Sequence, residues 1–371
     1  MKKYVSFLLA MLMLLSFAGC GVAPESAEKS AADTHTVVDH SGNEVEVPYK
    51  IDRIVVCDIL PLPSVLTIFF DSAEKIVGMA DTSMNAAKGS LLGELYPEIL
   101  NAETGFIEGS NINMEELLKL QPDVVFYSAA HPEQGEQLRR AGLPGIAISA
   151  SKWEYDAIET LNNWISLISE MFPDNSKAEI VEKYSDEVYN EVQQRVAAIA
   201  EDQREQVFFL FKYSETNIMT SGNRFFGQWW ADSIGAKNVG QELDADNQVT
   251  VNMEQVYAWN PSLIFVTNFT AAGPEDLYNN TVGVYDWSAI DAVENQRVYK
   301  MPLGMYRSYT AGVDTPVTLL WLAKTAYPDV FADIDIIAET RKYYKEVFGI
   351  DLTDAQAASI FAPAAEAGSG F

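Results

Sequence analysis

Aromatic and cationic side chains gather in segments that follow predicted strands. Arg307 lies between Tyr306 and Tyr309, shortly after the predicted strand 297–301. Arginine binds anions with a charged, bidentate fork, and aromatic rings supply apolar walls for a flat ligand. Open α/β sheets bind ligands at the carboxyl ends of their strands. The pattern therefore predicts a ligand-binding site, with candidate residues Pro63, Ser64, Trp153, Arg224, Tyr306, Arg307 and Tyr309.

The sequence shows no arrangement of a nucleophile with a general base that is typical of an enzyme. The chain has three histidines (His35, His40 and His131) and two cysteines. A protein site for a bare metal ion usually needs several His, Cys or carboxylate ligands converging on one point. Cys57 ends the apolar run 54–57, which predicts a buried, inert thiol. With no Gly-x-Ser-x-Gly turn and no Walker-type loop, we expect no catalytic residue, no bound metal cofactor and no enzyme activity.

The charge balance argues against nucleic-acid binding. The 371 residues include 53 acidic and 25 basic side chains, which gives a net charge of -28. A protein that grips a phosphate backbone needs clustered Lys and Arg. The acidic excess is interpreted here as a solubility feature of a protein outside the cell, with 48% hydrophobic residues typical of a folded globular chain.

The N-terminus carries the features of an export sequence. Lys2 and Lys3 precede an apolar run over 5–17, and Ala18-Gly19 precedes Cys20. This order resembles a bacterial lipobox, with Phe17 where Leu is usual. The resemblance implies cleavage before Cys20 and acylation (palmitate) of its thiol. We expect a lipoprotein signal peptide over 1–19, a lipidated tether over 20–35, and a protein anchored to the extracytoplasmic face of the cell membrane, on the outer surface or in the periplasm.

Short β-branched runs alternate with helical patterns along the rest of the chain, which predicts an α/β fold with mainly parallel sheets. The predicted strands are 53–57, 75–79, 123–127, 145–149, 206–211, 262–267 and 297–301. The predicted helices are 62–70, 114–120, 134–141, 155–171, 176–201, 225–234, 315–326 and 334–348.

An internal repeat predicts two similar lobes. The segment 113–126, which begins Asn-Met-Glu and contains a Pro before an apolar run, recurs at 252–265. A second echo, 71–78 against 232–240, lies upstream of each copy. The expected organisation is an N-terminal α/β lobe over 36–175, a linking helix over 176–201, a C-terminal α/β lobe over 202–351 and a flexible tail over 352–371.

An ordered set of segments carries a family resemblance. It comprises 36–45 with Pro48, 53–56, the two copies of the repeat, and 287–299. Over about 36–348 the chain resembles the solute-binding lipoproteins of ABC importers for ferric siderophores, haem and cobalamin, the type III periplasmic binding proteins. The resemblance implies two α/β lobes joined by a single long rigid helix, with a ligand cleft between the lobes.

The resemblance also implies a function and partners. The protein would capture an iron complex, a ferric siderophore first and haem or a corrinoid next, and deliver it as a monomer to an ABC permease dimer with its ATPase subunits. In the family, one glutamate on each lobe meets an arginine pocket on the permease, and these positions fall on Glu115 and Glu254. Three alternatives stay open: an oxyanion such as molybdate or tungstate, a bare metal ion, and a non-transport surface scaffold.

Overall fold

The computed structural model describes residues 34–363. Its N-terminal part, here the N-lobe, is built on a parallel sheet with the order β4-β3-β7-β8. The strands are β3 (Ile54–Val56), β4 (Ile76–Met79), β7 (Val124–Ser128) and β8 (Gly145–Ile148). All three residues of β3 are buried, as expected of a parallel strand covered by helices on both faces.

The C-terminal part, here the C-lobe, repeats this topology. Its parallel sheet has the order β12-β9-β14-β15, with β9 (Gln206–Leu210), β12 (Lys237–Asn238), β14 (Leu263–Val266) and β15 (Val298–Lys300). If the strands of each parallel sheet are counted along the chain, the first is flanked by the second and third, and the fourth lies beyond the third. The prediction of two similar lobes with mainly parallel sheets is therefore confirmed.

Smaller elements complete both lobes. The hairpins are β1 (Thr34–Val38) with β2 (Glu44–Pro48) and β5 (Ile107–Glu108) with β6 (Asn111–Ile112), and an antiparallel sheet joins β10 (Lys212–Tyr213), β11 (Ile218–Ser221) and β13 (Gln248–Val251). The N-lobe helices are α2 (Leu62–Phe70), α3 (Asp81–Lys88), α4 (Leu91–Leu95), α5 (Met114–Lys119), α6 (Pro132–Arg140) and α7 (Ala157–Met171). The C-lobe helices are α9 (Phe226–Ser233), α10 (Met253–Trp259), α11 (Pro274–Tyr278), α12 (Asp291–Glu294), α13 (Thr315–Ala326), α14 (Ile336–Tyr343) and α15 (Asp354–Ile360).

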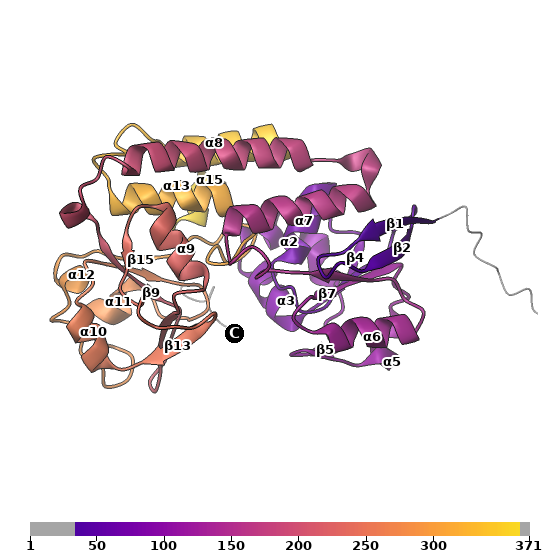
Figure 1. Cartoon of the computed structure of the whole chain (residues 1–371), viewed down its shortest axis with the longest axis horizontal. Coiled ribbons are helices and arrows are strands. Elements are labelled where there is room, and N and C mark those ends of the chain that lie inside the picture. The colour runs from indigo at the N-terminus through magenta and orange to yellow at the C-terminus, as the bar shows by residue number, and fades with distance from the viewer. Residues whose placement is uncertain (1–33, 364–371) are drawn as a thin grey trace, which may run out of the picture. The chain divides into compact units, whose positions relative to one another are not determined.

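One helix, α8 (Ala178–Val196), leads from the N-lobe into the C-lobe (Figure 1). It is shorter than the predicted span 176–201 at both ends, and a separate turn of 3₁₀-helix follows at Glu201–Gln203. Its buried face recurs every three to four residues, the spacing of one helical stripe, and this stripe packs against α7 and α13. The buried apolar residues of the stripe are Val181, Tyr184, Val188, Val192 and Val196.

The main hydrophobic core does not stop at the lobe boundary. One cluster of buried side chains runs from the N-lobe strands through the long helices and into the C-lobe sheet. It includes Ile54 and Phe69 of the N-lobe, Trp164, Val188 and Leu322 of the long helices, and Phe209 and Trp230 of the C-lobe. Separation of the lobes would therefore expose apolar surface, which opposes wide opening.

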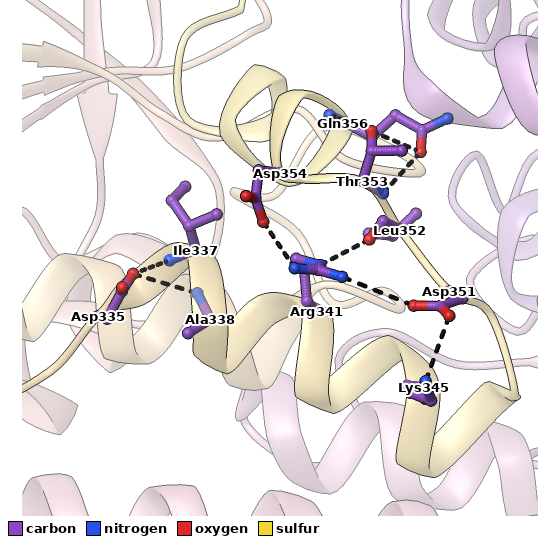
Figure 2. Close-up of polar contacts among 10 residues, drawn as sticks. All are labelled: Asp335, Ile337, Ala338, Arg341, Lys345, Asp351, Leu352, Thr353, Asp354 and Gln356. Atoms are coloured by element: carbon purple, nitrogen blue, oxygen red, sulfur yellow. Dashed lines mark hydrogen bonds and ion pairs between the residues drawn. The ribbon is translucent and has the colours of Figure 1, made fainter.

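The prediction of a flexible tail from 352 is wrong for residues 352–363. Helix α15 lies there, and its Ile360 is fully buried. Figure 2 shows how α14 holds this segment: the Arg341 guanidinium donates to the Leu352 carbonyl oxygen at 2.6 Å and to the Asp354 carboxylate at 2.7 Å. The composition suggested a loose segment, because small Ala-rich sequences have little apolar periodicity. In the structure, burial of Ile360 and the contacts of the Arg341 guanidinium order this segment.

Two expectations about membranes and location fall partly outside the described residues. The signal peptide, Cys20 and most of the tether lie before residue 34. Within residues 34–363, the helices are too short or too polar to span a membrane.

Candidate functional site

A small cavity lies between the two lobes, where the carboxyl ends of several strands meet. Its volume is about 210 Å³. The N-lobe wall comes from the segments after β3 and β8, the last residue of β7 and one α7 side chain: Asp58, Ile59, Leu60, Pro61, Ala150, Ser128 and Trp164. The C-lobe wall is Phe226, Phe269, Tyr306, Thr310 and Ala311. We call this the inner cavity; it lies where the ligand site of an open α/β sheet is expected.

Asp58 is the one ionisable acid in the lining of the inner cavity. It comes directly after Cys57 at the end of β3, and its carboxylate accepts from the Ser128 backbone N–H at 2.8 Å and from Gln134 Nε2 at 3.0 Å. His131 Nδ1 contacts the same carboxylate. These three partners hold the carboxylate in place within the N-lobe. His131 is thus a partner of Asp58 and not an isolated surface histidine.

A second, larger hollow lies beside the inner cavity and also spans both lobes. This outer groove has a volume of about 690 Å³. Trp153 and Arg224 both line it, so two of the predicted ligand-binding residues meet across the lobes. The Arg224 guanidinium is exposed and forms an ion pair with Asp244. The Trp153 and His40 rings pack in a T-shaped arrangement with their centroids 4.9 Å apart, and burial lowers the pKa of His40 to about 4.

Arg307 is buried in the interface between the lobes, with 1% of its surface exposed. Its guanidinium lies over the rings of Tyr306 and Phe269, with Cζ at 5.5 and 5.4 Å from the ring centroids. Its Nη1 also donates to the Thr82 carbonyl oxygen of the N-lobe at 3.4 Å. The predicted aromatic walls around Arg307 are present, but it is Tyr306 and Phe269 that line the inner cavity, and Arg307 does not.

The loop 304–314 that carries Tyr306 and Arg307 is held by a residue that sequence reasoning did not single out. Asp314 Oδ2 accepts from the Met305 backbone N–H at 2.7 Å, and its Oδ1 accepts from the Tyr344 hydroxyl. A Cβ at Gly304 would lie 2.3 Å from this carboxylate, so only glycine fits there. Asp314 was missed because its role depends on Tyr344, which is distant in sequence.

Four predicted ligand-binding residues do not line either hollow: Arg307, described above, and Pro63, Ser64 and Tyr309. Pro63 and Ser64 form the first turn of α2 and are buried, and the Ser64 hydroxyl donates to the Pro61 carbonyl oxygen at 2.6 Å. Tyr309 is fully buried, and its ring packs among Phe209, Phe211 and Phe225. The predicted helix start at residue 62 is correct, but the cavity is lined by the residues just before the helix, ending at Pro61, and not by its first turn.

The two glutamates of the repeat occupy equivalent positions. Glu115 and Glu254 are both exposed and both lie in the first turn of a helix, where the helix dipole favours a carboxylate. The Asn113 side chain caps α5, and the Asn252 side chain caps α10 through a capping box. The repeated Asn therefore explains the local fold, and leaves each glutamate facing solvent on its own lobe.

The described residues offer no cluster for a bare metal ion. Within 34–363, His, Cys, Asp and Glu side chains do not converge in a group of three or more. Cys57 is buried, and burial raises the pKa of its thiol, as predicted for an inert cysteine.

Comparison with known proteins identifies the family. A model of the family described as "Periplasmic binding protein" matches residues 72–303. The chain belongs to this family. Members are solute-binding proteins and not enzymes, and this chain is accordingly an extracytoplasmic solute-binding component of an ABC transporter of the type III, helical-backbone class.

Individual relatives differ in what they bind. The chain is 25% identical over 340 residues to the molybdate-binding protein MolA of Haemophilus influenzae, with 86% of this chain and 92% of the relative covered. It is 23% identical over 315 residues to an iron-uptake system-binding protein of Bacillus subtilis, with 81% and 90% covered. A periplasmic solute binding protein from Veillonella parvula has a similar structure, with TM-score 0.79, 27% identity, and 89% and 97% covered.

The Asp314 clamp predicts a pH effect on stability. Burial raises the pKa of Asp314 from 3.8 to about 6, although its hydrogen bonds act in the opposite direction. The folded state then holds this proton more tightly than the unfolded chain. The stabilisation is complete below pH ~4 and is lost as pH rises through about 6. The difference between 3.8 and about 6 corresponds to ~3 kcal/mol.

Urea unfolding of wild type and Asp314→Asn between pH 4 and 7.5 measures this effect. The wild-type minus variant free energy of unfolding should fall by one to three kcal/mol, roughly, as pH rises across that range. Other carboxylates titrate equally in both proteins and cancel. A difference that stays constant with pH would contradict the assignment.

Proposed function

We propose that the solute captured by this protein is a small oxyanion of the molybdate or tungstate type, bound in the inner cavity. The size of that cavity carries the proposal. Sites for drug-sized ligands usually measure ~300–1,000 Å³, and the inner cavity measures about 210 Å³. A haem, a corrinoid or a ferric siderophore is larger than this space, whereas a tetrahedral oxyanion is not.

Buried positive charge behind the C-lobe wall supports an anionic solute. Arg307 contacts two lining residues, Tyr306 and Phe269. Lys300 is also buried and donates to the carbonyl oxygens of Thr270 and Ala272 at 2.6 Å each. Burial, with a smaller contribution from Arg307, lowers the pKa of Lys300 to about 7. An anion nearby favours the charged forms of both side chains, because charges act strongly across a medium of low dielectric constant.

The carboxylate of Asp58 would repel an anionic solute, and its hydrogen-bond partners reduce this repulsion. Its carboxylate already accepts from Ser128 and Gln134 and contacts His131. The similarity to the molybdate-binding protein MolA, over 86% of this chain, is a further support for the oxyanion.

A ferric siderophore is the second candidate, and a different observation favours it. The outer groove, at about 690 Å³, is large enough for a chelate and is lined by Trp153, Tyr155, Phe225 and Trp229. The relative in Bacillus subtilis is named as an iron-uptake protein. The carboxylates of Glu154, Asp156, Asp232 and Asp246 also line this groove, so a neutral or cationic chelate suits it better than an anionic one.

A matched pair of arginine substitutions separates the two candidates. Arg307→Met keeps most of the side-chain volume but removes the buried charge. It should weaken molybdate binding about tenfold, the effect of ~1.4 kcal/mol, because a buried charge acts on an anion across a medium of low dielectric constant, and Arg307→Lys, which keeps the charge, should recover most of the loss. Arg224→Ala, in the outer groove, should change molybdate binding less than threefold.

Isothermal titration of the purified protein with molybdate, tungstate, sulfate, ferric desferrioxamine, haemin and cyanocobalamin gives the measurement. Binding of molybdate or tungstate alone, with the stated dependence on Arg307, is the expected result. Tight binding of a chelate with dependence on Arg224 would replace the oxyanion by the second candidate. No binding of either oxyanion would refute the proposal.

We also propose that Glu115 and Glu254 dock the protein onto its permease. Their support is geometric: the same exposed first-turn position on both lobes, on helices built from a repeated sequence. Two carboxylates on two linked lobes suit two arginine pockets on a dimeric permease, with its ATPase subunits on the cytoplasmic side. A monomer suffices for this geometry.

Glu115→Ala combined with Glu254→Ala should leave the Kd for solute within about threefold of wild type, while uptake by whole cells falls at least tenfold, since each charge-assisted contact contributes ~1.5–3 kcal/mol. Uptake is measured with the solute that the purified protein binds. Glu159→Ala, an exposed first-turn glutamate of α7, is the control and should transport normally. Normal uptake by the double variant would exclude the docking role.

We further propose that Cys20 is acylated and anchors the protein to the membrane. The lipobox-like sequence supports this, because two acyl chains give stable anchoring. Cys20→Ser should release a protein that still binds its solute into the soluble fraction, as judged by washing membranes and by the mass of the mature N-terminus. Persistent membrane association after high-salt washing would show that another segment holds the protein.

A further inference from the structure

The loop after β8 contains two consecutive residues in an unusual backbone conformation. Glu154 and Tyr155 have φ angles of 53° and 61°, in the left-handed region. A bulky side chain is rare in this region and persists only where the surroundings fix it. The loop is fixed at both ends: the Glu154 N–H donates to the Ser151 carbonyl oxygen at 3.1 Å, and the Asp156 carboxylate caps α7.

This conformation presents the Tyr155 ring to the opposite lobe. Its centroid lies 5.0 Å from that of Phe225 and 5.1 Å from that of Phe226, in edge-to-face arrangements. Phe225 and Phe226 are themselves in edge-to-face contact at 5.3 Å. Three aromatic rings therefore close on one another across the lobes, at distances typical of favourable aromatic pairs.

The aromatic cluster lies on the boundary between the two hollows. Phe226 lines the inner cavity, whereas Phe225 and Tyr155 line the outer groove. The N-lobe side divides in the same way, because Ala150 lines the inner cavity and the next residue, Ser151, lines the outer groove. Tyr155 contacts the lining of both hollows, so its ring is part of the partition between them.

We propose that Tyr155 determines the size of the solute that this protein accepts. The ring closes the partition between the two hollows. It thereby keeps the volume of the inner cavity at about 210 Å³ and separates it from the outer groove, whose volume is about 690 Å³. Removal of the ring would join the two into one space large enough for a metal chelate. This inference rests on the proposed function, in which the inner cavity is the solute site.

Tyr155 is the natural element for this role because of where it sits. Phe226 is buried at the start of α9 and belongs to the main core. Tyr155 is only partly buried and belongs to a loop at the edge of the main core, so a change of its ring disturbs core packing less than a change of Phe226. The strained backbone is consistent with a position held for function and not for stability.

Tyr155→Ala tests the proposal, with sodium molybdate and ferric desferrioxamine as probes in isothermal titration. The variant should bind ferric desferrioxamine at least tenfold more tightly than wild type, and the ratio of its affinity for the chelate to its affinity for molybdate should rise by at least the same factor. Tyr155→Phe keeps the ring and should behave as wild type. Trp229→Ala enlarges the outer groove alone and should gain no chelate affinity.

The outcomes distinguish this inference from the proposed function. If wild type binds molybdate but Tyr155→Ala gains no chelate affinity, the size filter is wrong and the function stands. If wild type binds no oxyanion but Tyr155→Ala gains chelate affinity, the filter stands and the oxyanion is wrong. Wild-type chelate binding equal to that of Tyr155→Ala also overturns the filter.

Thermal unfolding measures whether each variant is folded. If Tyr155→Ala does not fold, Phe225→Ala opens the same partition from the C-lobe side.

Discussion

The packing of α8 against α7 and α13 is the constraint on which the rest of this structure depends. Through it, buried side chains of both lobes join one hydrophobic core. Parting the lobes widely would expose that core to water, at a cost that grows with the apolar area uncovered. The loops that face each other across the lobes are therefore held at short range. A small inner cavity follows from this restraint, since its two walls cannot move far apart.

The site itself is built from loops, and each loop is fixed by a contact far away in the sequence. Asp314 and Tyr344 hold the loop that carries Tyr306 and Arg307. On the other side, Ser128, His131 and Gln134 fix the Asp58 carboxylate. Such positioning gives a preorganised site, in which little ordering remains to be done when a solute binds. The same kind of contact between the lobes holds Arg307, whose guanidinium lies against Tyr306 and Phe269 and donates to the Thr82 carbonyl oxygen.

Most of the fold was predictable because its signals are short-range. Every predicted strand is present within one or two residues, since apolar β-branched runs bounded by Pro, Gly or Asp mark buried parallel strands. The two copies of the repeat predicted two similar lobes, and in both copies the Asn caps the helix that follows, because capping depends on residues two or three positions apart. Predictions failed where long-range contacts decide the outcome: Ile360 and Arg341 order the segment after 352, and aromatic neighbours bury Tyr309.

The sequence by itself determined the two α/β lobes, the long helix between them, the paired glutamates and the presence of arginines among aromatic residues near the strand ends. Only the tertiary structure decided which of these residues meet. Trp153 and Arg224 share the outer groove, Arg307 lies behind Tyr306 and Phe269, and Tyr155 closes against Phe225 and Phe226. The reason is physical: strand and helix patterns record contacts within a few residues, whereas a cavity between two lobes is set by how their cores pack together.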